Sequence, residues 1–310
     1  MDFAPIIVFA YNRPHYLEET LMALKNNDEA KESDLYIYCD GPKSNADEKN
    51  LSLISKVRQL AHTISWGKNV YVIESDANKG LSGSVITGVT EVVNKYGKVI
   101  VLEDDIVVAP YFLKFMNDAL EIYNQEIGVA SISGHNFPIN NIFNDKETLF
   151  LKSATTWGWA TWKRSWDLFN PDAEQLIDLL KQKRSLYRFD FNNSYPFYSL
   201  LEKVKKGKIS SWGVCWYASI FLNEKLTLFP VCSMVKNIGM VGTNINSDST
   251  KFLGDSYYEH PILKFENVIE ENPAFRKELI HHFKANRRKA ITLHNVKKFF
   301  LKLTKKAIGR

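Results

Sequence analysis

The chain has 310 residues, 45% of them hydrophobic and 13% aromatic, which suffices for a large folded core and excludes general disorder. Its net charge of +5 is uneven, because residues 274–310 carry twelve Lys or Arg against one acid, and this excludes a nucleic-acid-binding surface spread over the whole protein. No leader or membrane-spanning stretch is evident, and the cysteines lack the spacing of a zinc or redox site, so we expect a cytosolic protein with reduced thiols.

The first half of the chain alternates short apolar runs with segments of helical periodicity. The runs, at 6–10, 35–39, 70–73 and 99–102, are rich in β-branched residues. Pro14 stands where a helix tolerates proline, at the start of one of the intervening helical segments. Such alternation is typical of a parallel sheet with helices on both faces. We therefore predict an α/β fold with a Rossmann-like, mostly parallel central sheet flanked by helices.

The pattern changes after Ser133. A strand is expected at 148–152, then an aromatic-rich helical region through Asn223, and a last short strand at 226–229. Within that region Trp159, Trp162 and Trp166 are spaced 3 and 4 apart, as in one buried helical stripe, and we expect core packing for Trp162 and Trp166. Since no long linker separates them, residues 1–133 and 134–273 are predicted to be two halves of one domain, followed by a basic tail at 274–310.

The basic tail has apolar positions at helical spacing. This pattern is typical of a helix that lies in an anionic membrane interface, and we expect the protein to be peripheral on the inner face of the cell membrane. The alternative is a helix packed on the body with a solvated basic face. The apolar positions are Val296, Phe299, Phe300, Leu303 and Ala307, and the basic ones are Lys297, Lys298, Lys302, Lys305 and Lys306.

Polar residues follow each of the first four predicted strands. The carboxyl ends of parallel strands meet at one edge of a sheet, where ligands bind in open α/β folds. We therefore expect these segments to converge on one cleft. They are Tyr11-Asn12-Arg13, Asp40-Gly41-Pro42, Asp76-Ala77-Asn78-Lys79-Gly80 and Glu103-Asp104-Asp105.

Three adjacent carboxylates, Glu103, Asp104 and Asp105, end the fourth strand. They repel one another unless a cation compensates, and Mg²⁺ or Mn²⁺ prefers such oxygen ligands. Strand alternation predicts that Glu103 and Asp105 point to one side and Asp104 to the other. The alternative is that an aspartate caps a following helix, expected near Pro110.

The ordered set of segments resembles bacterial family-2-type glycosyltransferases of surface-polysaccharide synthesis, which are similar in fold to N-acetylglucosaminyltransferase I. The resemblance implies a GT-A fold, a nucleoside-diphosphate sugar donor, usually a uridine nucleotide, and an acidic metal motif after the fourth strand. It spans about residues 5–242, in the segments Phe9-Ala10-Tyr11-Asn12-Arg13-Pro14, Cys39-Asp40-Gly41-Pro42-Lys43, Asn78-Lys79-Gly80-Leu81, residues 98–105 and Trp157-Gly158-Trp159-Ala160-Thr161-Trp162.

The resemblance also implies roles for single residues. The nucleotide would be lined by Ala10, Tyr11 and Arg13, with Asp40 on the uracil or ribose, and the helix entrance at Asn78, Lys79 and Gly80 would face the diphosphate. Asp104 would reach the ribose or a metal-bound water, and Asp105 would hold the ion, so that Asp105 and Glu103 are the expected catalytic carboxylates. From the residues themselves, we expect Trp157 and Trp159 to form an acceptor or donor wall of the sugar site, because Gly158 allows close approach of a ligand.

The second half departs from the family pattern. Ser210, Cys215 and Asn244 stand where relatives have an aspartate, an arginine and a histidine. Ser210 therefore takes the place of the base that an inverting transferase needs, although serine cannot replace a carboxylate, and Asn244 takes that of a second metal ligand. Asp167, Glu202, Asp248 and Asp255 are the other candidates for the base.

Two functions remain open from the sequence. One is a metal-dependent, inverting glycosyltransferase that moves a sugar from a UDP-sugar to a saccharide or lipid-linked acceptor. The other is a non-catalytic relative that binds nucleotide sugar or acceptor within a glycan-assembly complex. A dinucleotide-dependent oxidoreductase is disfavoured, because no Gly-x-Gly-x-x-Gly follows the first strand.

Overall fold

The computed structural model describes residues 2–138, 146–239 and 257–286. One sheet runs through the molecule in the order β3-β2-β1-β4-β8-β6-β9-β7, and its first four strands are parallel. β8 is antiparallel to both of its neighbours, so it joins the two halves of the sheet. The strands are β1 (Ile6–Ala10), β2 (Leu35–Cys39), β3 (Val70–Glu74), β4 (Lys98–Glu103), β6 (Val129–Ser133), β7 (Thr148–Leu151), β8 (Trp159–Trp162) and β9 (Leu226–Pro230).

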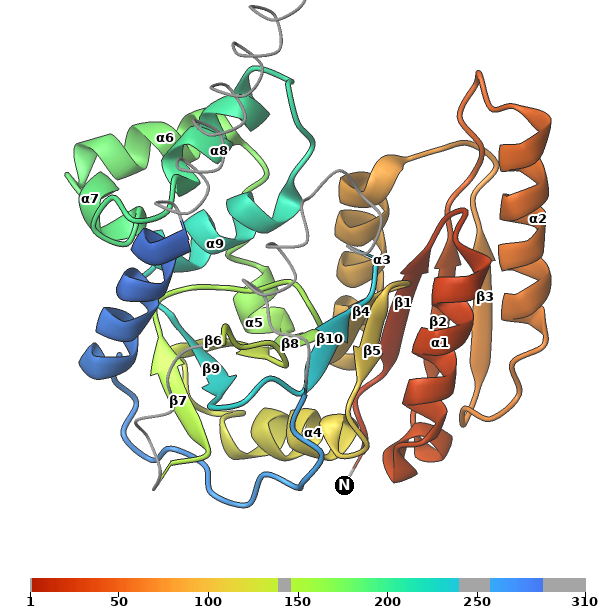
Figure 1. Ribbon diagram of the computed structural model, residues 1–310, viewed down its shortest axis with the longest axis horizontal. Helices are drawn as coiled ribbons and strands as arrows, with labels where there is room; N and C mark the ends of the chain where they lie inside the picture. The colour runs from red at the N-terminus through yellow and green to blue at the C-terminus, as the bar shows by residue number, and fades with distance from the viewer. Residues whose placement is uncertain (1, 139–145, 240–256, 287–310) are drawn as a thin grey trace, which may run out of the picture.

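Helices cover both faces of this sheet (Figure 1). Alternate side chains of β1 enter different cores: Ile6 and Val8 pack with α1, α2 and α4, whereas Ile7 and Phe9 pack with α3 and α9. Because both faces are buried, the central strands are apolar throughout. The helices are α1 (Pro14–Lys25), α2 (Glu48–His62), α3 (Gly80–Tyr96), α4 (Phe112–Ile122) and α9 (Trp212–Leu222). The predicted α/β class, with a mostly parallel sheet flanked by helices, is confirmed.

One prediction for the second half is wrong. Trp159–Trp162 is strand β8 and not part of a helix, and only Trp166 lies on a helix, the short α5 (Lys163–Trp166). The tryptophans still meet, because the ring centroids of Trp159 and Trp166 are 5.9 Å apart and both lie near Trp216 of α9. The spacing of 3 and 4 therefore arose where a strand runs into a helix.

A third layer, made of helices, packs against β7, β9 and α9. It comprises α6 (Ala173–Gln182), α7 (Leu186–Phe189), α8 (Phe197–Lys205) and a helical segment at 273–286. Phe275 and Leu279 of that last helix are 0% and 1% exposed, so the start of the predicted tail belongs to the core. Residues 287–310, with most of the predicted amphipathic helix, lie outside the described residues.

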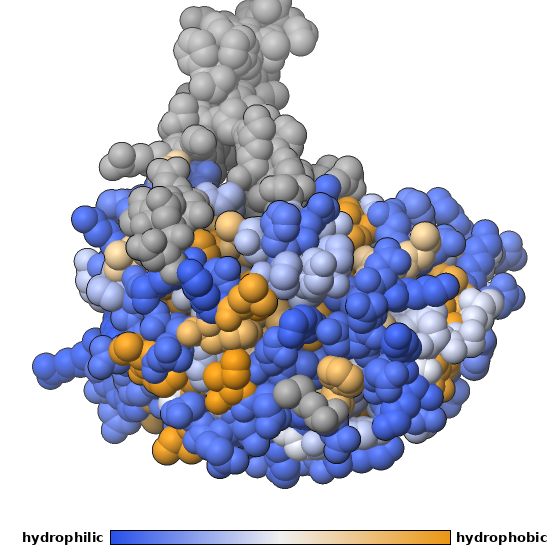
Figure 2. All heavy atoms as spheres, turned by 90° about the horizontal axis from the view of Figure 1, so that it is seen from below, coloured by the Kyte–Doolittle hydropathy of each residue, from blue (hydrophilic) through white to orange (hydrophobic). Residues whose placement is uncertain are grey.

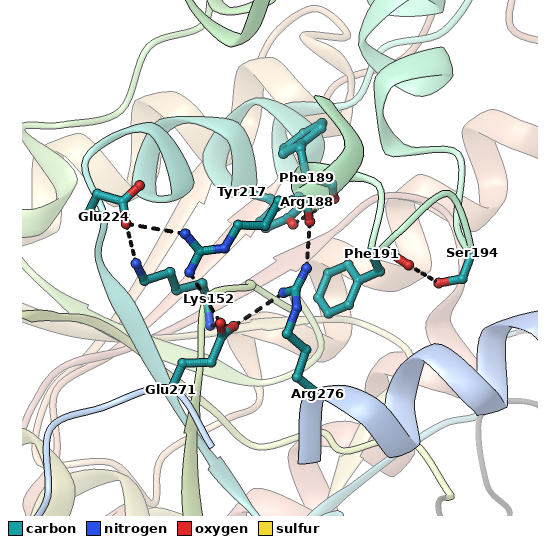
Figure 3. A network of polar contacts seen from close by, with 9 residues as sticks. All are labelled: Lys152, Arg188, Phe189, Phe191, Ser194, Tyr217, Glu224, Glu271 and Arg276. Carbon is teal, nitrogen blue, oxygen red and sulfur yellow. Dashed lines mark hydrogen bonds and ion pairs between the residues drawn. The ribbon is translucent and has the colours of Figure 1, made fainter. Parts of the chain in front are cut away.

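A polar network fixes the helix at 273–286 to the body (Figure 3). The Glu271 carboxylate accepts from the backbone N–H of Lys152 at 3.0 Å and pairs with Arg188 and Arg276, each at 3.3 Å. The Arg276 guanidinium also lies 4.6 Å from the centroid of the Phe191 ring. The helix at 273–286 is therefore held to the body by ionic contacts as well as by apolar burial.

The face opposite the carboxyl ends of the parallel strands is largely hydrophilic, with small groups of apolar side chains (Figure 2). Ile127 and Leu263 are exposed apolar residues, at 73% and 70%. Single exposed apolar side chains are ordinary on folded proteins. Among the helices that the structure describes, none is long and apolar enough to cross a bilayer.

Candidate functional site

A cavity of about 290 Å³ opens at the carboxyl ends of β1, β2 and β4. The loops after β1, β2 and β3 and the end of β4 all contribute to it, as the sheet order predicts. Eight of the predicted site residues line this cavity. They are Ala10, Tyr11, Arg13, Asp40, Asn78, Gly80, Glu103 and Asp104.

Arg13 holds two carboxylates at the end of β4. Its Nη1 donates to Asp105 Oδ2 at 2.8 Å, its Nη2 donates to Asp104, and its Nε donates to Asp104 Oδ2 at 3.4 Å. Asp104 and Asp105 therefore face the same group, and the alternation predicted for them is wrong. The physical reason is that the strand ends at Glu103 and the next two residues form a turn.

The aspartates do not cap the next helix either. β5 (Ile106–Val108) follows the turn, and α4 begins only at Phe112 after Tyr111, which makes no side-chain capping bond. β5 pairs with β10 (Val235–Asn237), a strand that the sequence pattern did not predict. The carboxylates are thus placed for the cavity and not for helix capping.

Burial dominates the ionisation of the acidic cluster. It raises the pKa of Glu103 to about 8, with repulsion from Asp105 and Asp104 adding to the effect. Burial also raises the pKa of Asp104, to about 6, although Arg13 acts in the opposite direction. Burial lowers the pKa of Arg13, but the two carboxylates more than offset this and raise it overall. Arg13 therefore stays charged, while its positive charge does not offset the effect of burial on Glu103 and Asp104.

Asp40 organises the loops and has no free lone pair for a base or ribose. Its Oδ1 accepts from the N–H groups of Gly41 and Lys79, at 2.9 and 2.8 Å, and its Oδ2 accepts from Asn78 Nδ2 and the Gly80 N–H, both at 2.9 Å. The N–H groups expected to face a diphosphate thus point to Asp40. Gly41 permits this closeness, because a Cβ there would lie 2.5 Å from the backbone of Ala77.

The end of β10 closes over the acidic cluster. The Ile238 N–H donates to the Asp105 carbonyl at 2.9 Å, and a Cβ on Gly239 would overlap Asp105 Oδ2. Asp105 Oδ1 is buried and has no hydrogen-bond partner among the described residues. Such an orphaned carboxylate oxygen is a chemically suitable ligand for Mg²⁺ or Mn²⁺. The described residues contain no group of three or more His, Cys, Asp or Glu side chains arranged around one ion.

Three predicted site residues lie elsewhere. Trp159 is 0% exposed in the core of β8, so its prediction as a sugar-site wall is wrong: β8 is an inner strand with both faces covered. Trp157 is half-buried against His135, with ring centroids 4.7 Å apart, and does not line the cavity. Ser210 is exposed and hydrogen-bonded to Ser82 at 2.8 Å, in a separate groove beside α3. Asn244 lies outside the described residues.

Other residues that line the cavity were not predicted from the sequence. Asn12 and Lys43 stand inside the segments that carry the family resemblance, so their position could have suggested them. Asn12 donates to Asn50 Oδ1 of α2 at 2.9 Å. Leu81 and Ser84 come from the first turns of α3, and nothing in their local pattern distinguishes them from other helix residues.

Comparison with known proteins gives a family for this region. The family described as Glycosyl transferase family 2 matches residues 6–189, more than half of the chain. No curated protein matches the sequence significantly.

Three solved structures are among those similar to this chain. S. aureus TarS is 15% identical, with a TM-score of 0.39 over 74% of this chain, which spans only 35% of that TarS chain. S. aureus TarS 1–349 in complex with UDP-GlcNAc is 14% identical, with a TM-score of 0.42 over 79% of this chain and 62% of its own. The mannosyltransferase PcManGT from Pyrobaculum calidifontis, in complex with GDP-Man and Mn²⁺, is 12% identical, with a TM-score of 0.38 over 71% and 72%.

Replacing Asp40 by alanine should destabilise the protein by about 3 kcal/mol, because three backbone N–H groups and one side-chain amide lose their acceptor. Asp47 is the matched control: it caps α2 through one exposed bond, and its alanine variant should cost about 1 kcal/mol. Urea unfolding measures both. Equal losses for the two variants would show that Asp40 is no more than an ordinary cap.

Without divalent ions, stability should fall as the pH rises from about 4 to about 8. The folded pKa values of Glu103 and Asp104 lie above the ordinary 4.5 and 3.8, so the folded protein holds protons that the unfolded chain releases. This contribution is complete below about pH 4, and it is lost by about pH 6 for Asp104 and by about pH 8 for Glu103. In EDTA, Glu103→Gln should remove most of the decline in Tm between about pH 6 and pH 8. Glu121→Gln, at an exposed site, should not, and an unchanged profile for Glu103→Gln would contradict the assignment.

Proposed function

This chain belongs to glycosyl transferase family 2, and we propose that it transfers a sugar from a uridine-diphosphate donor to a saccharide or lipid-linked acceptor. The proposal extends to a GT-A type, metal-dependent and inverting reaction in bacterial surface-glycan synthesis. The observation that supports it best is the cavity where Arg13 and the acidic cluster meet the loops after β1, β2 and β3.

The cavity suits a nucleoside diphosphate in charge and composition. Arg13 and Lys43 are cationic residues of its lining and suit phosphate oxygens. Phe9, Tyr11 and Leu81 supply apolar and aromatic surface, on which a nucleobase packs well. Asn12 and Asn78 also line the cavity; Asn78 Nδ2 already donates to Asp40 and Gly41, which leaves its Oδ1 for polar contacts. We assign donor binding to these residues and assign Asp40 the task of positioning Asn78.

A divalent ion fits the acidic cluster, with Asp105 as its protein ligand through the unpartnered Oδ1 and Asp104 beside it. When bound, such an ion supplies charge neutralisation to the departing diphosphate. Arg13 would stabilise the same charge by direct hydrogen bonds. Because both aspartates are almost fully buried, their positions are fixed before a ligand arrives.

The general base that an inverting displacement requires has no assigned residue. Of the described candidates, Asp167 pairs with Lys163 and Glu202 pairs with Lys206 on the surface, and neither lines the cavity. Asp248 and Asp255 lie outside the described residues. This favours, as a second candidate, a relative that binds nucleotide sugar without turning it over.

Titration calorimetry with UDP, GDP and CDP tests the donor, with UDP expected to bind at least ten times more tightly than the other two. A preference for GDP would refute the uridine assignment. Release of UDP from UDP-sugars then separates the enzyme from the non-catalytic relative, since only the enzyme turns over.

For the enzyme, Asp105→Ala should reduce turnover at least 100-fold in a protein that still folds, and a chelator should abolish turnover in the wild type. Asp118→Ala, at a half-buried aspartate of α4 paired with Lys114, is the control that should retain activity. Full activity in the presence of the chelator would exclude the metal-dependent mechanism.

We further propose that the segment 287–310 binds anionic membranes. It holds nine Lys or Arg and no acid. Each basic residue near an anionic leaflet is worth about 1 kcal/mol, so half of them would give about 4 kcal/mol before ordering costs. A membrane-bound acceptor would make such docking useful, because the search for substrate is then confined to a surface.

Cosedimentation with phosphatidylserine vesicles tests this role. Binding should fall with added salt and should be lost when the chain is ended at Asn286, which leaves the buried helix at 273–286 intact. The triple variant Lys297→Glu, Lys298→Glu, Lys302→Glu should weaken binding at least tenfold. The same reversal at the exposed Lys31, Lys49 and Lys56 of the body should have a much smaller effect. Undiminished binding of the shortened chain would exclude the anchor.

A further inference from the structure

Arg13 lies between the cavity and Asp105. Its side chain lines the cavity and is 37% exposed, whereas the side chains of Asp104 and Asp105 are 4% and 9% exposed. Asp105 is not part of the cavity lining. A cation that approaches Asp105 from the cavity therefore meets a guanidinium first.

The far side of the carboxylate is closed by backbone. Gly239 packs so tightly that a Cβ would overlap Asp105 Oδ2 and lie 2.8 Å from Arg13 Nη1. The Ile238 N–H holds the Asp105 carbonyl from the same direction. Among the described residues, access to Asp105 is thus governed by the Arg13 side chain, which is long and flexible, and not by the turn that carries the acids.

We infer that Arg13 serves as the counter-ion of Asp105 in the donor-free protein and is transferred to the diphosphate when the donor binds, so that a divalent ion replaces it as the counter-ion of Asp105. Two cations cannot share one buried carboxylate without strong repulsion. A diphosphate in the cavity offers the guanidinium an equivalent partner. The transfer of Arg13 to a diphosphate rests on the proposed function, whereas the competition between Arg13 and a divalent ion for Asp105 does not.

This exchange makes ion and nucleotide binding cooperative. Without nucleotide, a divalent ion on Asp105 Oδ1 is repelled by the Arg13 guanidinium on Oδ2 of the same carboxylate, and moving Arg13 away costs its ionic contacts with the aspartates. With nucleotide bound, Arg13 has already moved. Removing the guanidinium should therefore strengthen binding of the metal alone, an effect opposite to that expected if Arg13 only held the site in shape.

Calorimetric titration with Mn²⁺ alone, without nucleotide, tests the exchange. Arg13→Met should bind Mn²⁺ at least ten times more tightly than the wild type, and Arg13→Lys, which keeps the charge, should stay within about threefold. Arg58→Met is the matched control, because Arg58 is also partly buried, pairs with Glu74 at 3.0 Å and does not line the cavity. It should bind Mn²⁺ like the wild type.

Arg13→Gln is a second neutral variant, and it keeps an amide donor for Asp104. Near-UV circular dichroism shows whether each variant is folded. Equal or weaker Mn²⁺ binding by the folded neutral variants overturns the exchange. UDP binding by the wild type is recorded separately, in EDTA and in saturating Mn²⁺. If UDP binds the wild type but Mn²⁺ affinity does not respond to Arg13, the exchange fails and the proposed function stands. If the neutral variants gain Mn²⁺ affinity but the wild type does not bind UDP even with Mn²⁺, the counter-ion role stands and the proposed function fails.

Discussion

The ionic contact of Arg13 with Asp104 and Asp105 is the constraint on which the site depends. β1 and β4 are neighbours in the sheet, with Phe9 opposite Glu103, so the loop after β1 reaches the acids that end β4. Burial of those acids would strongly disfavour their charge without a nearby cation. One guanidinium meets two of the three carboxylates. Glu103 has no such partner, and burial together with repulsion from the aspartates raises its pKa.

A second constraint is the full coordination of Asp40. Four donors from two loops converge on its carboxylate, which ties the end of β2 to the start of α3. The loops that line the cavity are consequently set by main-chain hydrogen bonds. Asn78 Nδ2 donates both to this carboxylate and to the Gly41 carbonyl, which fixes the orientation of the Asn78 side chain. A preorganised site of this kind loses less conformational entropy when a ligand binds.

The second half of the chain completes the site from beyond the region matched by the family. β10 returns to pair with β5, and this pairing brings Gly239 against Asp105 although the two are far apart in sequence. The same half carries Ser210, which lies beside Ser82 of α3 and away from the acids. Ser210, one of the departures from the family pattern, thus lies apart from the acidic cluster.

The sequence by itself determined the parallel half of the fold and most of the cavity. Strands buried on both faces appear in the sequence as continuous apolar runs, and the loops after them appear as polar residues. Arg13, Asp40 and Asp104 could therefore be located from local pattern. Tertiary structure decided what local pattern does not encode. A tryptophan spacing of 3 and 4 fits a helix, yet Trp159 belongs to a strand because β4 and β6 pair with it. Likewise, only the close packing of the loops shows that Asp40 is saturated and that Arg13 stands before Asp105, since hydrogen-bond partners distant in sequence leave no periodic signal.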